Sequence, residues 1–151
     1  MYEEERVSWE RRITRAIMLG LLNGILWIFV PVVLLSYLES IAPGVSIPFT
    51  STLVYTFGAV ITGLFVLSAL SEGMIVSIPF ESGGYLAAAV YIYVAVDGGS
   101  LALSASGINF VFSIQPLTFL LVLPPLYGAL RVPLSYLLDY HEAARASPDS
   151  V

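Results

Sequence analysis

The feature that most constrains this chain is a long stretch of sequence without a basic residue. Between Ala16 and Leu130 there is neither lysine nor arginine, and the acidic residues are few and widely spaced. Hydrophobic residues make up 58% of the 151 residues and charged residues only 11%, whereas a typical soluble domain carries about a quarter charged residues. A chain of this size cannot bury that much apolar side chain in one core, so much of it should face lipid.

Four apolar runs predict four transmembrane helices, at residues 16–38, 52–71, 80–96 and 117–138. A hydrocarbon layer about 30 Å thick needs roughly 20 helical residues, so the third run is a short span. We therefore predict an all-α membrane protein, a four-transmembrane-helix bundle over residues 16–138 with a small extracytoplasmic β-hairpin cap. No small-residue cleavage site follows the first run, which indicates a retained span and not a signal peptide.

The distribution of arginine predicts the orientation of these helices. Four of the six basic residues precede the first apolar run, and the other two lie within or after the last. Because positively charged segments stay on the cytoplasmic side, we expect a multi-pass protein of the cell membrane with both termini in the cytoplasm. Residues 1–15 are then a cytoplasmic amphipathic segment and residues 139–151 a cytoplasmic tail, with the loops 39–51 and 97–116 outside.

The segment between the third and fourth runs has the pattern of a β-hairpin. Residues 98–115 alternate apolar with small or polar residues, and Ser106-Gly107 divides them into two arms. An isolated hairpin is only marginally stable in water, so its apolar face should cover helix ends of the same chain or contact another subunit. This face is formed by four residues of the second arm, Ile108, Phe110, Phe112 and Ile114.

A short repeat precedes three of the predicted helices. The pentapeptide VSIPF occurs at residues 45–49 and 76–80, and a weaker copy, FSIQPL, occupies residues 112–117. The residue before a proline is extended and proline is favoured in the first turn of a helix, so the repeat is typical of a helix start. The alternative is an internal duplication with inverted topology, as in many transporters.

Small residues indicate where the predicted helices touch. Gly20 and Gly24 have the spacing that lets two helix backbones approach closely, and Asn23 between them can hydrogen-bond across such a contact. The pattern does not say whether the neighbouring helix belongs to the same chain. The same spacing recurs within and just after the second run, in Ala59 and Gly63 and in Ala69 and Gly73.

Arg131 is the one basic residue inside a predicted span. It lies seven residues before the inner end of that span at Leu138, which corresponds to roughly 11 Å of helix. Its guanidinium can extend to the headgroups, or it can pair with Glu72 or Glu81, which we predict at a similar depth. Three interpretations stay open: a structural ion pair or anchor, a contact to a lipid headgroup or anionic ligand, and a residue on a transport path.

Prolines predict breaks in two of the spans. Pro124 and Pro125 lack the amide protons that a helix needs, and Pro31 has the same effect in the first run. A broken helix beside a buried charge is one way in which transporters build a binding site. Kinks are nevertheless common in membrane helices, because neighbouring groups satisfy the freed carbonyls.

No pattern in the sequence indicates catalysis, a cofactor or a metal ion. There is no cysteine, the single histidine, His141, follows the last apolar run, and there is no glycine-rich phosphate-binding loop. The basic residues are too few to form a face for nucleic acid. We therefore expect no enzyme, no cofactor and no nucleic-acid partner.

The expected partners are the lipid bilayer and either other membrane subunits or further copies of the chain. Few polar groups inside the spans are typical of a non-catalytic accessory or scaffold subunit of a membrane assembly. The main alternative is a homo-oligomeric channel or small-solute carrier, with Arg131, Glu72 and Glu81 near the path. An enzyme acting on lipid is a third and weaker interpretation.

Overall fold

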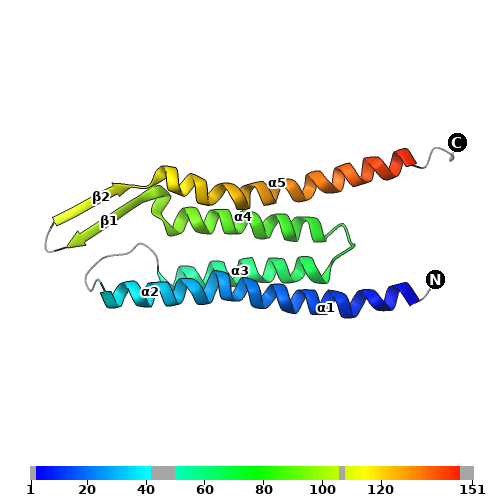
Figure 1. Cartoon of the computed structure of the whole chain (residues 1–151), viewed down its shortest axis with the longest axis horizontal. Coiled ribbons are helices and arrows are strands. Elements are labelled where there is room, and N and C mark those ends of the chain that lie inside the picture. The colour runs from blue at the N-terminus through cyan, green and yellow to red at the C-terminus, as the bar shows by residue number, and fades with distance from the viewer. Residues whose placement is uncertain (1–2, 42–49, 106–107, 147–151) are drawn as a thin grey trace.

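The computed structural model describes residues 3–41, 50–105 and 108–146. Four continuous helices run up and down, and a two-stranded ribbon joins the last two (Figure 1). The start of the first helix and the end of the last lie at the same end of the molecule, called the terminal end below, and the ribbon lies at the opposite end. The elements in order are α1 (Glu3–Gly24), the π-helix η1 (Ile25–Phe29), α2 (Val30–Ile41), α3 (Ser51–Leu70), α4 (Ser77–Ala95), the 3-10 helix η2 (Asp97–Gly99), β1 (Ser100–Ala105), β2 (Ile108–Ser113) and α5 (Gln115–Ala146).

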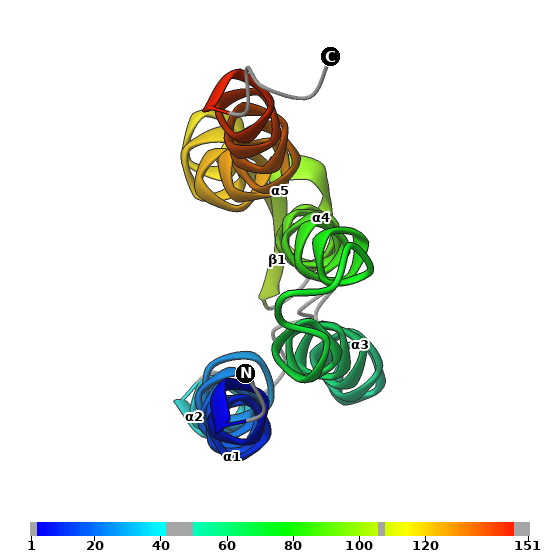
Figure 2. The same ribbon diagram turned by 90° about the vertical axis from the view of Figure 1, so that its right-hand side faces the viewer.

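The four helices form a single curved layer (Figure 2). In this layer α1 packs against α3, α3 against α4, and α4 against α5, while α1 has no extensive contact with α4 or α5 among the described residues. Both edge helices, α1 and α5, lie to the same side of the two central ones, so the layer has a concave face (Figure 2). The predicted fold class is therefore wrong in its architecture, because the helices leave one face open and do not close into a bundle.

The predicted cap is also wrong, because the two strands in this segment do not lie over the helix ends. The strands β1 and β2 pair antiparallel, with Ser100 opposite Ser113 and Ala105 opposite Ile108. This short ribbon extends beyond the ends of α4 and α5 (Figure 1). Neither strand packs extensively on a helix within the described residues. The described part of the chain is thus mostly helical, and no β-structure in it covers the helix ends. The turn predicted at Ser106-Gly107 lies outside the described residues.

Three helices are long and apolar enough to cross a membrane: Trp9–Ile41, Ser51–Leu70 and Gln115–His141. The predicted span at residues 80–96 is helical too, as part of α4, but Glu81 and several serine, glycine and tyrosine residues lower its hydropathy. α4 lies between α3 and α5, so two of its sides face protein. These helices support a multi-pass membrane protein, and the side that faces the cytoplasm stays a prediction.

The first span is longer than predicted because α1, η1 and α2 are continuous from Glu3 to Ile41. Pro31, where the sequence predicts a break, follows a π-helical turn in which the Val30 amide bonds to the Ile25 carbonyl five residues earlier. A wider turn before a proline accommodates the missing amide proton without ending the helix. The helix α5 likewise continues through Pro124, Pro125 and Pro133, so the predicted break in the last span is absent.

The prolines of the repeat lie where helices begin. Pro79 falls in the first turn of α4, and Pro116 is the second residue of α5. Proline is tolerated there because the first amides of a helix have no intrahelical partner. Both copies within the described residues are thus helix starts, as the simpler interpretation requires. The copy at residues 45–49 lies outside them.

The core of the layer is small and sits where η1, α3 and α4 meet. Ile61 and Ala88 are almost fully buried there beside Tyr91. The ring of Tyr91 contacts Trp27 edge-on and stacks on Phe57, with ring centroids 5.7 Å apart in both pairs. Such aromatic pairs add to the apolar contact itself, so this cluster fixes how the first helix crosses the central pair.

Candidate functional site: a groove along the concave face

The concave face of the layer contains a groove of about 1080 Å³, lined by side chains of α1, η1, α3, α4 and α5. Along α5 it extends from Leu121 to Asp139, which is about 27 Å of helix at 1.5 Å per residue. A hydrocarbon layer is about 30 Å thick. The groove therefore runs along most of one membrane crossing.

The middle of the groove is apolar and has a floor of small residues. Ser68, Ala69 and Ala88 form this floor, and all three are buried. The walls are larger apolar side chains, which include Leu22 on α1 and Leu121 on α5. Small residues at the bottom of a groove let the backbone of another helix approach closely.

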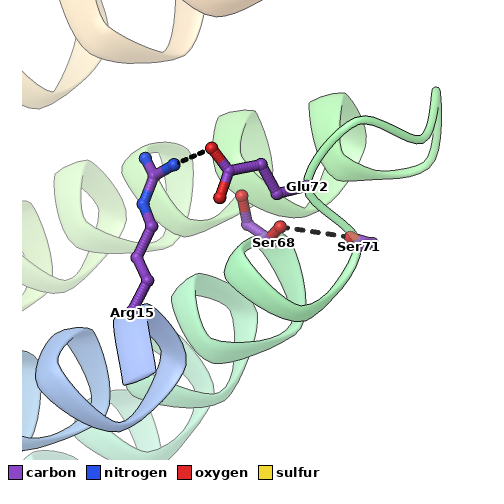
Figure 3. Close-up of polar contacts among 4 residues, drawn as sticks. All are labelled: Arg15, Ser68, Ser71 and Glu72. Carbon is purple, nitrogen blue, oxygen red and sulfur yellow. Dashed lines mark hydrogen bonds and ion pairs between the residues drawn. The ribbon is translucent and has the colours of Figure 1, made fainter. Parts of the chain in front are cut away.

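Charged and hydroxyl groups gather at the terminal end of the groove. Arg15 pairs with Glu72 there and joins α1 to the turn between α3 and α4 (Figure 3). Two further carboxylates line the same end, Glu81 on α4 and Asp139 on α5. Within the described part of the chain, neither of these two carboxylates has an ion-pair partner. The groove thus holds more acidic than basic groups at this level.

The turn that carries Glu72 is built by the end of α3. The Ser71 hydroxyl donates to the carbonyls of Leu67, at 2.6 Å, and Ser68, at 3.3 Å (Figure 3). These bonds satisfy carbonyls that a helix end leaves free. Gly73 then adopts φ +82°, which a residue with a Cβ adopts only at a cost, so this glycine reverses the chain and does not pack helices.

The pair of Arg131 with Glu72, one of the predicted possibilities, is not formed. Glu72 is engaged by Arg15, while Arg131 is exposed on α5 at the opposite edge of the layer. Arg131 lines a neighbouring pocket of about 410 Å³ together with Glu81 and Ser135. No ion pair of Arg131 occurs among the described residues. The central helix α4 separates α3 from α5, which is why Arg131 is brought closer to Glu81 than to Glu72.

Asn23 makes its hydrogen bonds within its own helix. Its amide nitrogen donates to the Leu19 carbonyl at 2.9 Å, and its side-chain oxygen accepts from Trp27 Nε1 at 3.1 Å. Both Asn23 and Trp27 line the groove. The predicted bond across a helix contact is thus replaced by one that orients the indole on the groove wall.

Ser82, which was not among the predicted site residues, links α4 to α5. The Ser82 hydroxyl donates to the Ala129 carbonyl at 2.8 Å. In an α-helix this carbonyl would accept from residue 133, but Pro133 has no amide proton. Ser82 therefore satisfies a carbonyl that a proline in the neighbouring helix has freed. The sequence contains both residues, but only the structure brings them together.

Glycines occur at each contact between neighbouring helices. A Cβ at Gly20 would lie 3.1 Å from Val66, and one at Gly58 would lie 2.8 Å from the Trp27 carbonyl oxygen. Similarly, a Cβ would meet the ring of Phe65 at Gly84 and the ring of Tyr85, at 2.7 Å, at Gly128. Of these four glycines, only Gly20 was among the predicted packing residues.

Most of the other predicted packing residues do not lie at close contacts between neighbouring helices. At Gly24 and Gly63 no atom of another helix comes within 4 Å of the position that a Cβ would take, and Ala59 is exposed. Ala69, by contrast, is buried on the groove floor. The open positions Ala59 and Gly63 lie on a surface of α3 that faces away from the groove.

The residues predicted to form an external contact belong to β2 and to the residue directly after it. In the register of the strands, Ile108, Phe110 and Phe112 lie opposite Ala105, Leu103 and Leu101. Ile114 comes after β2, and its amide donates to the Gly99 carbonyl at 2.7 Å.

The groove has no constellation that indicates catalysis or metal binding. The described residues contain no group of three or more histidine, cysteine, aspartate or glutamate side chains placed to hold a metal ion. Its polar groups are carboxylates, two arginines in or beside it, serines, the Asn23 amide, the Trp27 indole and the Tyr85 hydroxyl. Such groups suit binding by charge and hydrogen bonds.

Comparison with protein families, with characterised proteins and with solved structures found no match.

Proposed function

We propose that this protein is a non-catalytic subunit of a larger membrane assembly and that its concave face points toward the rest of that assembly. The observation that carries the proposal is the open layer. Charged and polar side chains line a groove that no other part of the described chain covers. Polar groups that face hydrocarbon are costly, so membrane proteins turn them toward protein or water.

Co-purification tests this proposal. The tagged chain, gently extracted from its own membranes, is expected to carry at least one other membrane protein at a constant ratio. Ser68→Leu fills the groove floor and should lose that protein while the chain stays folded. Leu67→Phe is the matched control, because Leu67 points about 100° away from Ser68 around α3, is exposed and does not line the groove. Equal retention by both variants would argue against the groove as the contact surface.

A homo-oligomeric channel or small-solute carrier is the second candidate. It is favoured by the charged residues in and beside the groove, since two such layers facing each other would enclose a polar path between Glu72, Glu81 and Arg131. The test is solute or ion flux into vesicles that contain the purified protein. A carrier or channel should lose flux with Arg131→Gln while the oligomer stays intact, whereas a subunit of another machine shows no flux of its own.

A further inference from the structure

We infer that the groove holds one transmembrane helix of a different protein, a helix with a lysine or arginine at the level of Glu81 and Asp139. This inference rests on the proposed function and names the class of partner. It is drawn from the length of the groove, from its floor and from the charges at its terminal end.

The length of the groove distinguishes a helix from a lipid. The groove runs about 27 Å along α5, close to the thickness of the whole hydrocarbon layer. A lipid tail reaches across only one leaflet, about half of that distance. An occupant that fills the groove from Leu121 to Asp139 therefore crosses both leaflets, as a transmembrane helix does.

The floor of the groove also fits a helix. Ser68, Ala69 and Ala88 are small and almost fully buried, while Leu22 and Leu121 on the walls are 63% and 46% exposed. Transmembrane helices associate closely where one of them presents small residues, because dispersion contacts between the backbones replace contacts with lipid. The exposed leucines would then pack on the sides of the bound helix.

The charges at the terminal end indicate the chemistry of the partner. Glu72 already pairs with Arg15, but Glu81 and Asp139 have no basic partner among the described residues. A basic residue near one end of the bound helix would neutralise them. Lysine and arginine are common at the cytoplasmic ends of membrane helices, so the inference agrees with the predicted orientation of this chain.

A second copy of the chain fits the groove less well. Its only edge helices are α1 and α5. On α1 the basic residue at this level, Arg15, is held by Glu72, and the guanidinium of Arg12 lies near Gly73 of the same chain. On α5 of a copy that crosses the membrane in the same direction, Arg131 would reach the level of Glu81, but Asp139 would face the Asp139 of the groove and repel it. A second copy would thus leave Asp139 without a positive charge, and on our inference that charge comes from another protein.

Photo-crosslinking in native membranes tests the inference. A photo-crosslinking amino acid replaces Leu22 on one wall, Leu121 on the other, or, as the control, Leu67, which is exposed on α3 and does not line the groove. The expected result is that both wall positions label the same segment of one other protein, identified by peptide mass spectrometry. That segment should be an apolar helix with lysine or arginine near Asp139, and Leu67 should label lipid.

Charge reversal supplies a second readout. Glu81→Lys together with Asp139→Lys should lower the crosslink yield from both walls by about tenfold or more, because a buried charge pair becomes a repulsion. Glu39→Lys, at the other end of the first helix, is the matched control and should leave the yield unchanged. Equal yields in all three proteins would overturn the role assigned to the carboxylates and with it the inference.

Three further outcomes would overturn the inference of a bound helix. They are crosslinks from the groove walls to lipid alone, to a second copy of the chain, or to a helix without a basic residue near Glu81 and Asp139. The proposed function is tested separately by co-purification. If other subunits accompany the chain but the groove walls label only lipid, the proposed membrane assembly is supported and the proposed helix in the groove is wrong. If the chain is purified alone, both proposals fail.

Discussion

At the scale of single residues, Ser82 and Pro133 act as a unit although they belong to different helices. The proline removes an amide from α5, and the serine of α4 supplies the missing donor to the Ala129 carbonyl. In a membrane such a donor matters because no water reaches the carbonyl from the hydrocarbon layer. The contact therefore fixes the position of α5 along α4 and shapes one wall of the groove.

Ser82→Ala should lower the free energy of unfolding by about 1 kcal/mol, the usual scale for hydrogen bonds between membrane helices. The cost should nearly vanish when Pro133→Ala restores an amide for the same carbonyl. Ser135→Ala is the control, because the Ser135 hydroxyl donates to the Val132 carbonyl of its own helix. Thermal unfolding in detergent compares the four variants with the unchanged protein, and an unchanged cost of Ser82→Ala in the Pro133→Ala background would contradict this pairing.

The ion pair of Arg15 and Glu72 makes a second prediction for single residues. Both side chains are partly exposed, at 50% and 37%, so each single change to glutamine should cost less than about 1 kcal/mol of stability. The double variant should cost less than the sum of the two, since the same contact is lost in each. Arg131→Gln combined with Glu72→Gln should instead be additive. A coupling between Arg131 and Glu72 would show that the pair assigned here is wrong.

At the scale of elements, each helix contact depends on a glycine that faces one bulky group. Gly58 is the clearest case, because a Cβ there would lie 2.5 Å from Ile28 Cγ1 and 2.8 Å from the Trp27 carbonyl oxygen. That carbonyl lies four residues before Pro31, which cannot donate a hydrogen bond to it. Close approach of α3 at this position thus covers the part of the first helix that Pro31 disturbs.

Gly58→Ala should therefore separate the first helix from α3 or distort both, at a cost of about 1–3 kcal/mol. Gly63→Ala, on the same helix with no atom of another helix within 4 Å, should be neutral or slightly stabilising. Thermal unfolding of the two variants side by side checks the contrast. Equal losses of stability from Gly58→Ala and Gly63→Ala would mean that helix propensity or lipid contact, and not packing on Trp27, determines the stability change.

The sequence predicted the helices far better than their arrangement. Apolar runs of sufficient length located all four of them, and the prolines of the repeat marked the starts of α4 and α5. Glycines spaced four apart were a poorer guide. Gly58, Gly84 and Gly128 each contact a bulky group singly, so no repeating pattern reveals them.

The groove was not predictable from the sequence for a related reason. Glu72 and Glu81 are nine residues apart and were predicted at a similar depth, but Asp139 is far along the chain, and only the curvature of the layer brings all three to one groove. In a membrane protein, an apolar face that touches lipid and one that touches a partner can have the same hydropathy. The periodicity of apolar residues therefore does not reveal whether four helices close into a bundle or remain open.

At the scale of the whole molecule, the open layer is the feature that demands an explanation. Two helices form its edges, its apolar core is small, and its concave face carries charged groups with nothing over them in the described residues. A protein that functioned alone would be expected to close over such groups. On our proposal, another membrane protein completes the layer.

Native mass spectrometry of the intact protein, released gently from its own membranes, tests that claim most directly. The expected result is a complex of fixed mass that contains this chain and at least one different membrane protein. Charge reversal at Glu81 and Asp139 should release the chain from that complex. A single chain that carries only lipid, or a complex made of copies of this chain alone, would contradict the proposal.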